Sequence, residues 1–267
     1  MQARLLPAIR GVSWIFDGFR LYRRNPPMLT TLTLGYLLLV VAFGQLQPVG
    51  PFLLPLFLPL LTALIANGCR TLQLGLARAE LFHGLRQRRA ALLRLGGLHL
   101  IGTLTILAID LLLQGGDSGT LIGGKETGEG ASSPLDEAEM LWHMLRLLLI
   151  ALPVLLAFWF APLLTAWEGV PALKSLFFSL VAVWRNWRAF LVYAVTATLI
   201  GVVLPGVLLL VASLVSKPLA EVLSIVLRIL LLLVFAPVLM TGIYQSYCDV
   251  FAPVANPDGP GTPDDAT

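Results

Sequence analysis

Long hydrophobic runs separated by short arginine-rich stretches dominate the pattern of the chain. An α-helix needs about 20 apolar residues to cross the roughly 30 Å hydrocarbon core of a bilayer. Runs of about that length occur at residues 28–47, 52–69, 96–114, 141–166, 189–212 and 221–245. They are continuous rather than alternating in polarity, which excludes a transmembrane barrel. The pattern therefore predicts an all-α fold, a polytopic transmembrane helix bundle with six spans.

Proline interrupts the second run more than the others. Pro51, Pro55 and Pro59 recur every four residues, so one face of this helix lacks N–H donors. Membrane helices tolerate such prolines when neighbouring groups satisfy the freed carbonyls. A complete span and an unwound or re-entrant segment are both compatible with this stretch.

Composition agrees with a chain dissolved in lipid. Hydrophobic residues make up 57% of the chain and charged residues 12%, whereas soluble domains carry about 25% charged residues. Residues 1–22 lack an uninterrupted hydrophobic stretch and a small-residue cleavage site, so we expect no cleaved secretory signal, and the first span should act as an anchor. The two cysteines, Cys69 and Cys248, are too few for a disulfide framework.

Lysine and arginine predict the orientation, because they accumulate in cytoplasmic loops. Fourteen of them precede the first span or lie between spans two and three and between spans four and five, whereas the opposite loops contain Lys125 and Lys217. This asymmetry predicts a bacterial inner-membrane protein with both termini in the cytoplasm. It also accounts for the pI of about 9.1 without a nucleic-acid partner.

The predicted organisation is a single integral membrane domain over residues 1–251. An acidic, Gly-rich loop at residues 115–140 is expected on the outside. The tail at residues 252–267 is rich in Pro, Gly and Asp, a composition typical of disorder, and is expected in the cytoplasm.

Each arginine-rich stretch precedes a pair of spans and is amphipathic. The hydrophobic face of the first consists of Val12, Ile15, Phe16, Phe19 and Tyr22. That of the third consists of Leu173, Leu176, Phe177, Leu180, Trp184 and Trp187. Such helices lie in the headgroup layer and anchor a protein there; docking of a cytoplasmic partner is the alternative. The residues expected in the inner aromatic belt are Trp14, Tyr22, Trp167, Trp184, Trp187, Tyr244 and Tyr247.

The even-numbered spans contain similar sequences near their ends. Pro59-Leu60-Leu61-Thr62-Ala63 recurs as Pro162-Leu163-Leu164-Thr165-Ala166, and loosely as Pro237-Val238-Leu239-Met240-Thr241. Together with the amphipathic stretches, these matches predict three parallel repeats, each an interfacial helix plus two spans. Chance similarity between Leu- and Ala-rich segments is the alternative.

Catalytic and cofactor motifs are not recognised in the sequence. Gly119 to Lys125 approaches a phosphate-binding loop, but Glu126 stands where that motif has Ser or Thr. His83, His99 and His143 fall on separate segments without the spacing of metal ligands. The chain also lacks a Ser nucleophile elbow and the Pro-x-acid-x-x-base motif of mitochondrial carriers. We therefore expect no catalytic, cofactor or metal site.

Three charged residues, Asp110, Arg146 and Arg228, fall inside the predicted spans at a similar depth near the outer surface. A charge costs about 2.5–3.5 kcal/mol near the centre of a membrane helix and usually faces the bundle interior, where it pairs. We expect an intramembrane polar cluster with an Asp110–Arg146 ion pair. Arg228 would add a positive charge that could hold a lipid phosphate or another anion. The alternative is that both arginines extend to the membrane surface.

Several stretches carry a family resemblance. They are Gly11-Val12-Ser13-Trp14, Asp17 to Pro26, Leu81 to Arg86, Trp159 to Pro162 and Gly169 to Lys174. Through them the chain resembles a family of uncharacterised multi-pass inner-membrane proteins of Gram-negative bacteria. More distantly it is similar to the membrane domains that accompany some glycerophosphodiester phosphodiesterases. The resemblance implies the fold and location but no activity.

Two main function hypotheses remain. The first is a non-enzymatic accessory or scaffold protein that binds membrane lipids or another membrane protein. The second is a transporter or lipid-handling protein that uses the charged cluster together with the proline-kinked spans. An intramembrane enzyme is the least supported alternative.

Overall fold

The computed structural model describes residues 3–82, 84–113 and 134–251. The motif at Gly119–Lys125, His83, most of the loop predicted at residues 115–140 and the tail at residues 252–267 lie outside the described residues. That residues 1–251 form a single domain stays a prediction.

Six helical segments of the described chain are long and apolar enough to cross a membrane, which confirms the predicted fold class. They are α2 (Pro26–Gln45), α3 (Gly50–Leu74), α4 (Arg89–Leu113), α5 with α6 (Pro134–Phe158 and Ala161–Glu168), α8 with α9 (Trp187–Thr198 and Leu204–Val215) and α10 with α11 (Lys217–Leu230 and Ala236–Val250). Two π-helical segments, η3 (Leu199–Val203) and η4 (Leu231–Phe235), interrupt the last two spans.

The boundaries of two helices, α5 and α3, differ from the predicted ones. Helix α5 begins at Pro134, so residues 134–140, predicted as part of the acidic loop, are helical. The proline-rich α3 is one continuous helix from Gly50 to Leu74 with Pro55 and Pro59 inside it. It is long enough for a complete span. Its neighbour α4 approaches very closely, because Gly96 lies against the Leu56 carbonyl and a Cβ atom there would collide with it.

Two of the three expected interfacial helices are α-helices. These are α1 (Arg10–Tyr22) and α7 (Ala172–Arg185), which precede the first and third pairs of spans. The corresponding stretch before the second pair is instead a 3₁₀-helix, η1 (Arg78–Phe82). It is enclosed by Gly75 and Gly84, whose φ angles of 66° and 71° suit the ends of a helix but not its interior. The threefold repeat itself stays a prediction.

Helix α1 is packed inside the protein along one face and does not simply rest on lipid. It contacts α11 and α8 along its length. Gly11 lies against the backbone of α8 at Ala189, and Gly18 lies against α11 at Thr241 and Gly242. These two glycines let the helix axes approach closely.

The prediction of a lipid-facing aromatic belt is therefore wrong for four of its seven members. Trp14, Tyr22, Tyr244 and Tyr247 are buried in the hydrophobic core, with Trp14 fully inaccessible. Trp184 and Trp187 are exposed, at 69% and 53%, as a belt requires. The physical reason is that one face of α1, which carries Trp14 and Tyr22, packs on protein. Tyr244 and Tyr247 of α11 pack against Trp167 in the same way.

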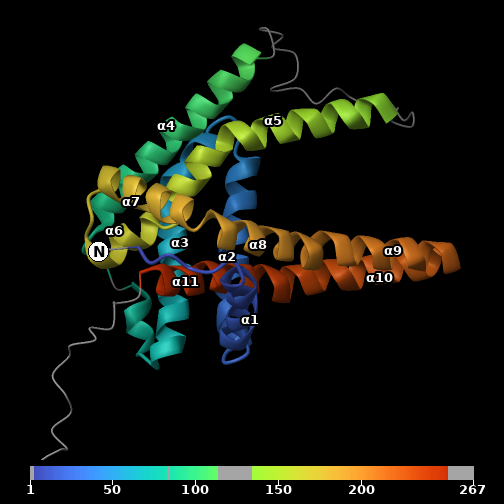
Figure 1. Cartoon of the computed structure of the whole chain (residues 1–267), viewed down its shortest axis with the longest axis horizontal. Helices are drawn as coiled ribbons and strands as arrows, with labels where there is room; N and C mark the ends of the chain where they lie inside the picture. Colours follow the sequence, from blue (N-terminus) through green and yellow to red (C-terminus); the bar gives the residue numbers. More distant parts are fainter. Residues whose placement is uncertain (1–2, 83, 114–133, 252–267) are drawn as a thin grey trace, which may run out of the picture.

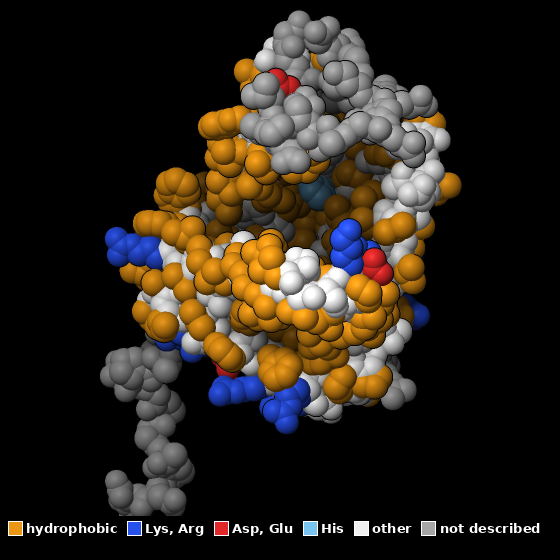
Figure 2. Space-filling view, turned by 90° about the vertical axis from the view of Figure 1, so that its right-hand side faces the viewer, with side chains coloured by type: hydrophobic (Ala, Val, Ile, Leu, Met, Phe, Trp, Pro, Cys, Tyr) orange, Lys and Arg blue, Asp and Glu red, His pale blue; other side chains and the backbone are white. Residues whose placement is uncertain are grey.

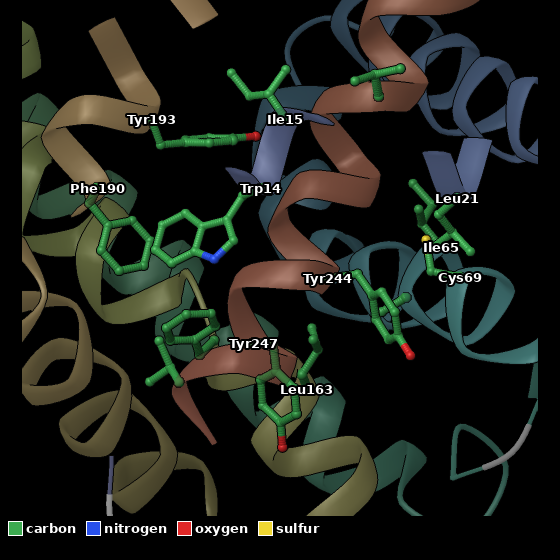
Figure 3. Packing of buried hydrophobic residues seen from close by; sticks show 14 of the residues in the cluster. Trp14, Ile15, Leu21, Ile65, Cys69, Leu163, Phe190, Tyr193, Tyr244 and Tyr247 are labelled. Atoms are coloured by element: carbon green, nitrogen blue, oxygen red, sulfur yellow. The ribbon is translucent and has the colours of Figure 1, made fainter. Parts of the chain in front are cut away.

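The core lies at the arginine-rich end of the spans, where α1, α6 and α7 pack between them. Trp14 and Ile15 of α1 meet Phe190 and Tyr193 of α8 there, and Tyr244 and Tyr247 of α11 lie close by (Figure 3). We call this part of the molecule the base. It joins all three pairs of spans through one set of buried side chains.

Beyond the base the spans separate into arms. Helices α4 and α5 and the hairpin of α9 and α10 extend from it in different directions (Figure 1). In the most hydrophobic stretch of α3, 44% of the residues are buried inside the protein. In the corresponding stretch of the span Trp187–Val215, only 6% of the residues are buried. Seen from the tips of the arms, the surface is mostly hydrophobic and is hollowed between them (Figure 2).

Candidate functional site

The expected ion pair between Asp110 and Arg146 is present and joins α4 to α5. Arg146 donates from Nε to Oδ1 of Asp110 over 3.1 Å, and its terminal nitrogen lies 3.1 Å from the same oxygen. The Asp110 side chain is 2% exposed and that of Arg146 is 35% exposed. Asp110 lies near the end of α4 and Arg146 three turns into α5, so an antiparallel pairing of the two helices brings them together.

His143 extends this pair by one hydrogen bond. Its Nδ1 atom lies 2.9 Å from the terminal nitrogen of Arg146, one helical turn away on α5. Because a guanidinium only donates hydrogen bonds, Nδ1 is the acceptor in this contact. Among the described contacts, Asp110, Arg146 and His143 thus form a chain of polar side chains.

An arrangement of this kind stabilises the contact between two membrane helices. Its two charges cancel, so the pair by itself offers no net charge to an anion. Removal of one partner of a buried pair leaves an uncompensated charge in a medium of low dielectric constant, and this strongly destabilises the fold. The geometry thus supports a role in holding α4 and α5 together.

Arg228 is placed differently. It lies on α10, which packs against α9 and η4, and its side chain is exposed. An exposed arginine inside a span can extend along the helix to the headgroups. The structure brings Asp110 and Arg146 together, while the three-residue cluster with Arg228 stays a prediction.

A second polar contact supports the π-helical segment of the last span. Pro237 has no N–H to donate to the carbonyl of Leu233, four residues before it. Tyr22 and Thr30 donate their hydroxyl groups to this carbonyl, each over 3.0 Å. The end of α1 and the start of α2 are thereby tied to η4.

A third polar group ties α1 to the end of the chain. Asp249 on α11 accepts hydrogen bonds from Nε of Arg10 over 2.9 Å and from the indole nitrogen of Trp14 over 2.7 Å. The carboxylate is 25% exposed and the Arg10 side chain 36% exposed. This contact fixes the first amphipathic helix on the last span.

Neutral polar side chains complete the base. Asn67 accepts from the indole nitrogen of Trp167 over 2.7 Å and donates to the Leu81 carbonyl over 2.8 Å. Asn186 accepts from the backbone N–H of Leu6 over 2.8 Å. Ser179 donates to the Leu156 carbonyl over 3.0 Å and accepts from the Phe160 N–H over 2.9 Å, bridging the break between α5 and α6.

Sequence reasoning did not single out Asp249, Asn67, Asn186 or Ser179. For Asn67 a signal existed, because an uncharged polar residue within a hydrophobic run tends to bond with a neighbouring helix. Asp249 and Asn186 fall near span ends, where polar residues are common, so the pattern alone does not distinguish them.

Within the described residues, no three His, Cys, Asp or Glu side chains come close enough together to hold a metal ion. His99 stacks on Phe158 with ring centroids 4.4 Å apart. His143 serves the ion pair.

Comparison with known proteins gives one informative match. No family model matches the chain. No solved structure matches it either. The probable inner membrane protein BTH_II0599 of Burkholderia thailandensis is 34% identical over 205 residues, which cover 72% of this chain and 74% of that protein. With six apolar helices in its described residues that are long enough to span a bilayer, the chain is a multi-pass membrane protein. It belongs to the family of this probable inner membrane protein, a family of Gram-negative inner-membrane proteins.

Proposed function

We propose that this protein is a non-enzymatic accessory protein that holds another membrane protein against its arms. The observation that carries the proposal is the contrast between base and arms. The base is closely packed and tied by hydrogen bonds, whereas the arms leave most of their hydrophobic surface without protein contacts in the described chain.

Several large side chains near the arm tips support this role. Leu112 at the end of α4 is 79% exposed, and Leu214 near the end of α9 is 80% exposed. Packing between membrane helices relies on close van der Waals contact rather than on exclusion of water. A wide separation between arms therefore offers several helix faces at once to a partner helix.

Site-specific photo-crosslinking tests the proposal. A photoreactive amino acid would replace Leu112 or Leu214 in the full chain, in its own membrane. We expect both positions to capture the same membrane protein, identified by mass spectrometry of the adduct. A matched control is Leu173, which is 69% exposed but lies on α7 at the base. It should not capture that protein. Adducts with lipid alone at both arm positions would contradict the accessory role.

A lipid-handling or transport function is the second candidate. It is favoured by the Asp110–Arg146 pair, since charged side chains inside membrane spans often mark pathways for substrates or ions. The hollow between the arms is consistent with a place for a lipid (Figure 2). On this alternative, the arm positions would capture lipid and not protein.

We further propose that both termini lie in the cytoplasm. The support is the basic bias of the loops on one side, because positively charged loops stay on the cytoplasmic side of the inner membrane. A green fluorescent protein fused after Phe251 should fluoresce, whereas alkaline phosphatase inserted at Val49, between α2 and α3, should be active. The opposite pair of results would invert the topology.

A further inference from the structure

A hydrophobic cavity of about 330 Å³ lies between α1 and the last two spans. Its size falls in the range of about 300–1,000 Å³ that is typical of ligand pockets. The described residues that line it are all hydrophobic; they come from α1, η3, α9, α10, η4 and α11. Phe16 and Phe19 form its outer edge and are 57% and 41% exposed, so the cavity is open on one side.

The cavity lies where both π-helical segments meet. Gly201 in η3 lies against the ring of Phe235 in η4, and a Cβ atom at Gly201 would collide with that ring. Ile200 of η3 and Val234 of η4 both line the cavity. Single π-helical turns inside α-helices occur frequently at functional sites. The anchoring of Leu233 by Tyr22 and Thr30 holds this widened region in place.

The position along the span indicates what fills the cavity. The last span has 34 residues, a length of about 51 Å at 1.5 Å per residue, which exceeds the roughly 30 Å hydrocarbon core. Its polar end, with Thr241, Gln245 and Asp249, must then extend toward the headgroups. The cavity-lining stretch from Leu227 to Val238 precedes that end, so it lies on the hydrophobic side of these polar residues. Water would find no polar partner on such walls.

Positive charge is available beside the opening. Arg20 follows Phe16 by one helical turn on α1, and Arg23, the residue directly after the helix, follows Phe19 by the same spacing. Both arginines are exposed. Arg20 lies 3.0 Å from Asp17, but exposed pairs of this kind contribute little and do not prevent a second contact. Guanidinium groups form strong hydrogen bonds with phosphate oxygens.

We propose that this cavity binds one acyl chain of an anionic phospholipid from the leaflet on the arginine-rich side, with the phosphate held by Arg20 and Arg23. The lipid would fill the space between α1 and the two π-helical segments and join them. This site is separate from the arm tips, so it does not depend on the proposed accessory role.

A photoreactive lipid tests the proposal. The full chain would be placed in nanodiscs of phosphatidylethanolamine containing a small fraction of phosphatidylglycerol with a diazirine in one acyl chain. After illumination, mass spectrometry would map the adducts. We expect them to concentrate on α1, on residues 200–208 and on residues 227–238. A uniform spread over the exposed helix faces, Leu214 included, would overturn the proposal.

Filling the cavity provides the matched comparison. Leu204→Trp places a larger side chain in the cavity wall and should reduce these adducts several-fold. Val202→Trp lies at the same depth but is 66% exposed and does not line the cavity, so it should leave them unchanged. If Leu204→Trp does not fold, Ile200→Trp tests the same wall. Equal adduct yields in the cavity-filling and control variants would count against the site.

The headgroup contact is tested separately with the same preparation. Arg20→Gln combined with Arg23→Gln should lower capture of the phosphatidylglycerol probe more than capture of a phosphatidylcholine probe with the same chain. Identical capture of both probes by the wild-type protein would overturn the arginine contact.

Discussion

Trp14→Ala is expected to destabilise the protein by roughly 3–5 kcal/mol, the usual cost of removing a large aromatic side chain from a core. Trp14 is fully inaccessible and packs against Phe190 and Tyr193 with ring centroids 5.1 and 6.0 Å apart. The substitution also removes one of the hydrogen bonds that Asp249 accepts. Thermal or denaturant-induced unfolding of the purified protein in mild detergent measures the effect.

Trp184→Ala is the matched control for this substitution. Trp184 is 69% exposed on α7, and exposed substitutions usually change stability by within about 0.5 kcal/mol. Trp14→Phe separates two contributions, because phenylalanine retains most of the packing but cannot donate to Asp249. If Trp14→Ala and Trp184→Ala had equal effects, Trp14 would belong to a lipid-facing belt after all.

Asp110→Ala is expected to have the second largest effect, a loss of about 2–4 kcal/mol. Removing one partner of a fully buried pair costs about 3–5 kcal/mol, and the lower figure reflects the 35% exposure of the Arg146 side chain, which can recruit water or headgroups. Unfolding in detergent should show it, and Arg146→Ala should cost at least as much, because it removes the positive partner of a carboxylate that is only 2% exposed.

A double-mutant cycle decides whether the two residues act as a pair. Residues in direct contact show coupling energies of about 0.5–3 kcal/mol. We expect such coupling between Asp110→Ala and Arg146→Ala. Strict additivity would rule the pair out. The cycle of Asp110→Ala with Arg228→Ala then tests the predicted three-residue cluster, in which Arg228 would also be coupled.

The membrane character of the chain could be predicted from the sequence because the bilayer imposes a simple rule. A span must be about 20 apolar residues long and must satisfy its backbone internally, so hydrophobic runs correspond to helices almost one to one. The Asp110–Arg146 pair was predictable for a related reason. A charge inside a span is so costly that an oppositely charged neighbour at similar depth is the natural partner.

Packing within the base could not be predicted in the same way. An amphipathic helix such as α1 has the same sequence pattern whether its hydrophobic face meets lipid or protein, since both are apolar. Gly11 and Gly18 favour contact of α1 with protein, because they allow α8 and α11 to approach α1 closely. That approach placed Trp14 beside Asp249, a contact between residues 235 positions apart.

The sequence by itself determined that the chain is a six-span helical membrane protein, with an arginine-rich side and a few charges inside its spans. Only the tertiary structure decided where the core lies, which aromatic residues are buried, and where the π-helical segments meet beside a hydrophobic cavity. The physical reason is that hydrophobicity acts locally and is visible in each run of residues. Close contact between helices depends instead on small residues and hydrogen-bonding groups that come together from distant parts of the chain.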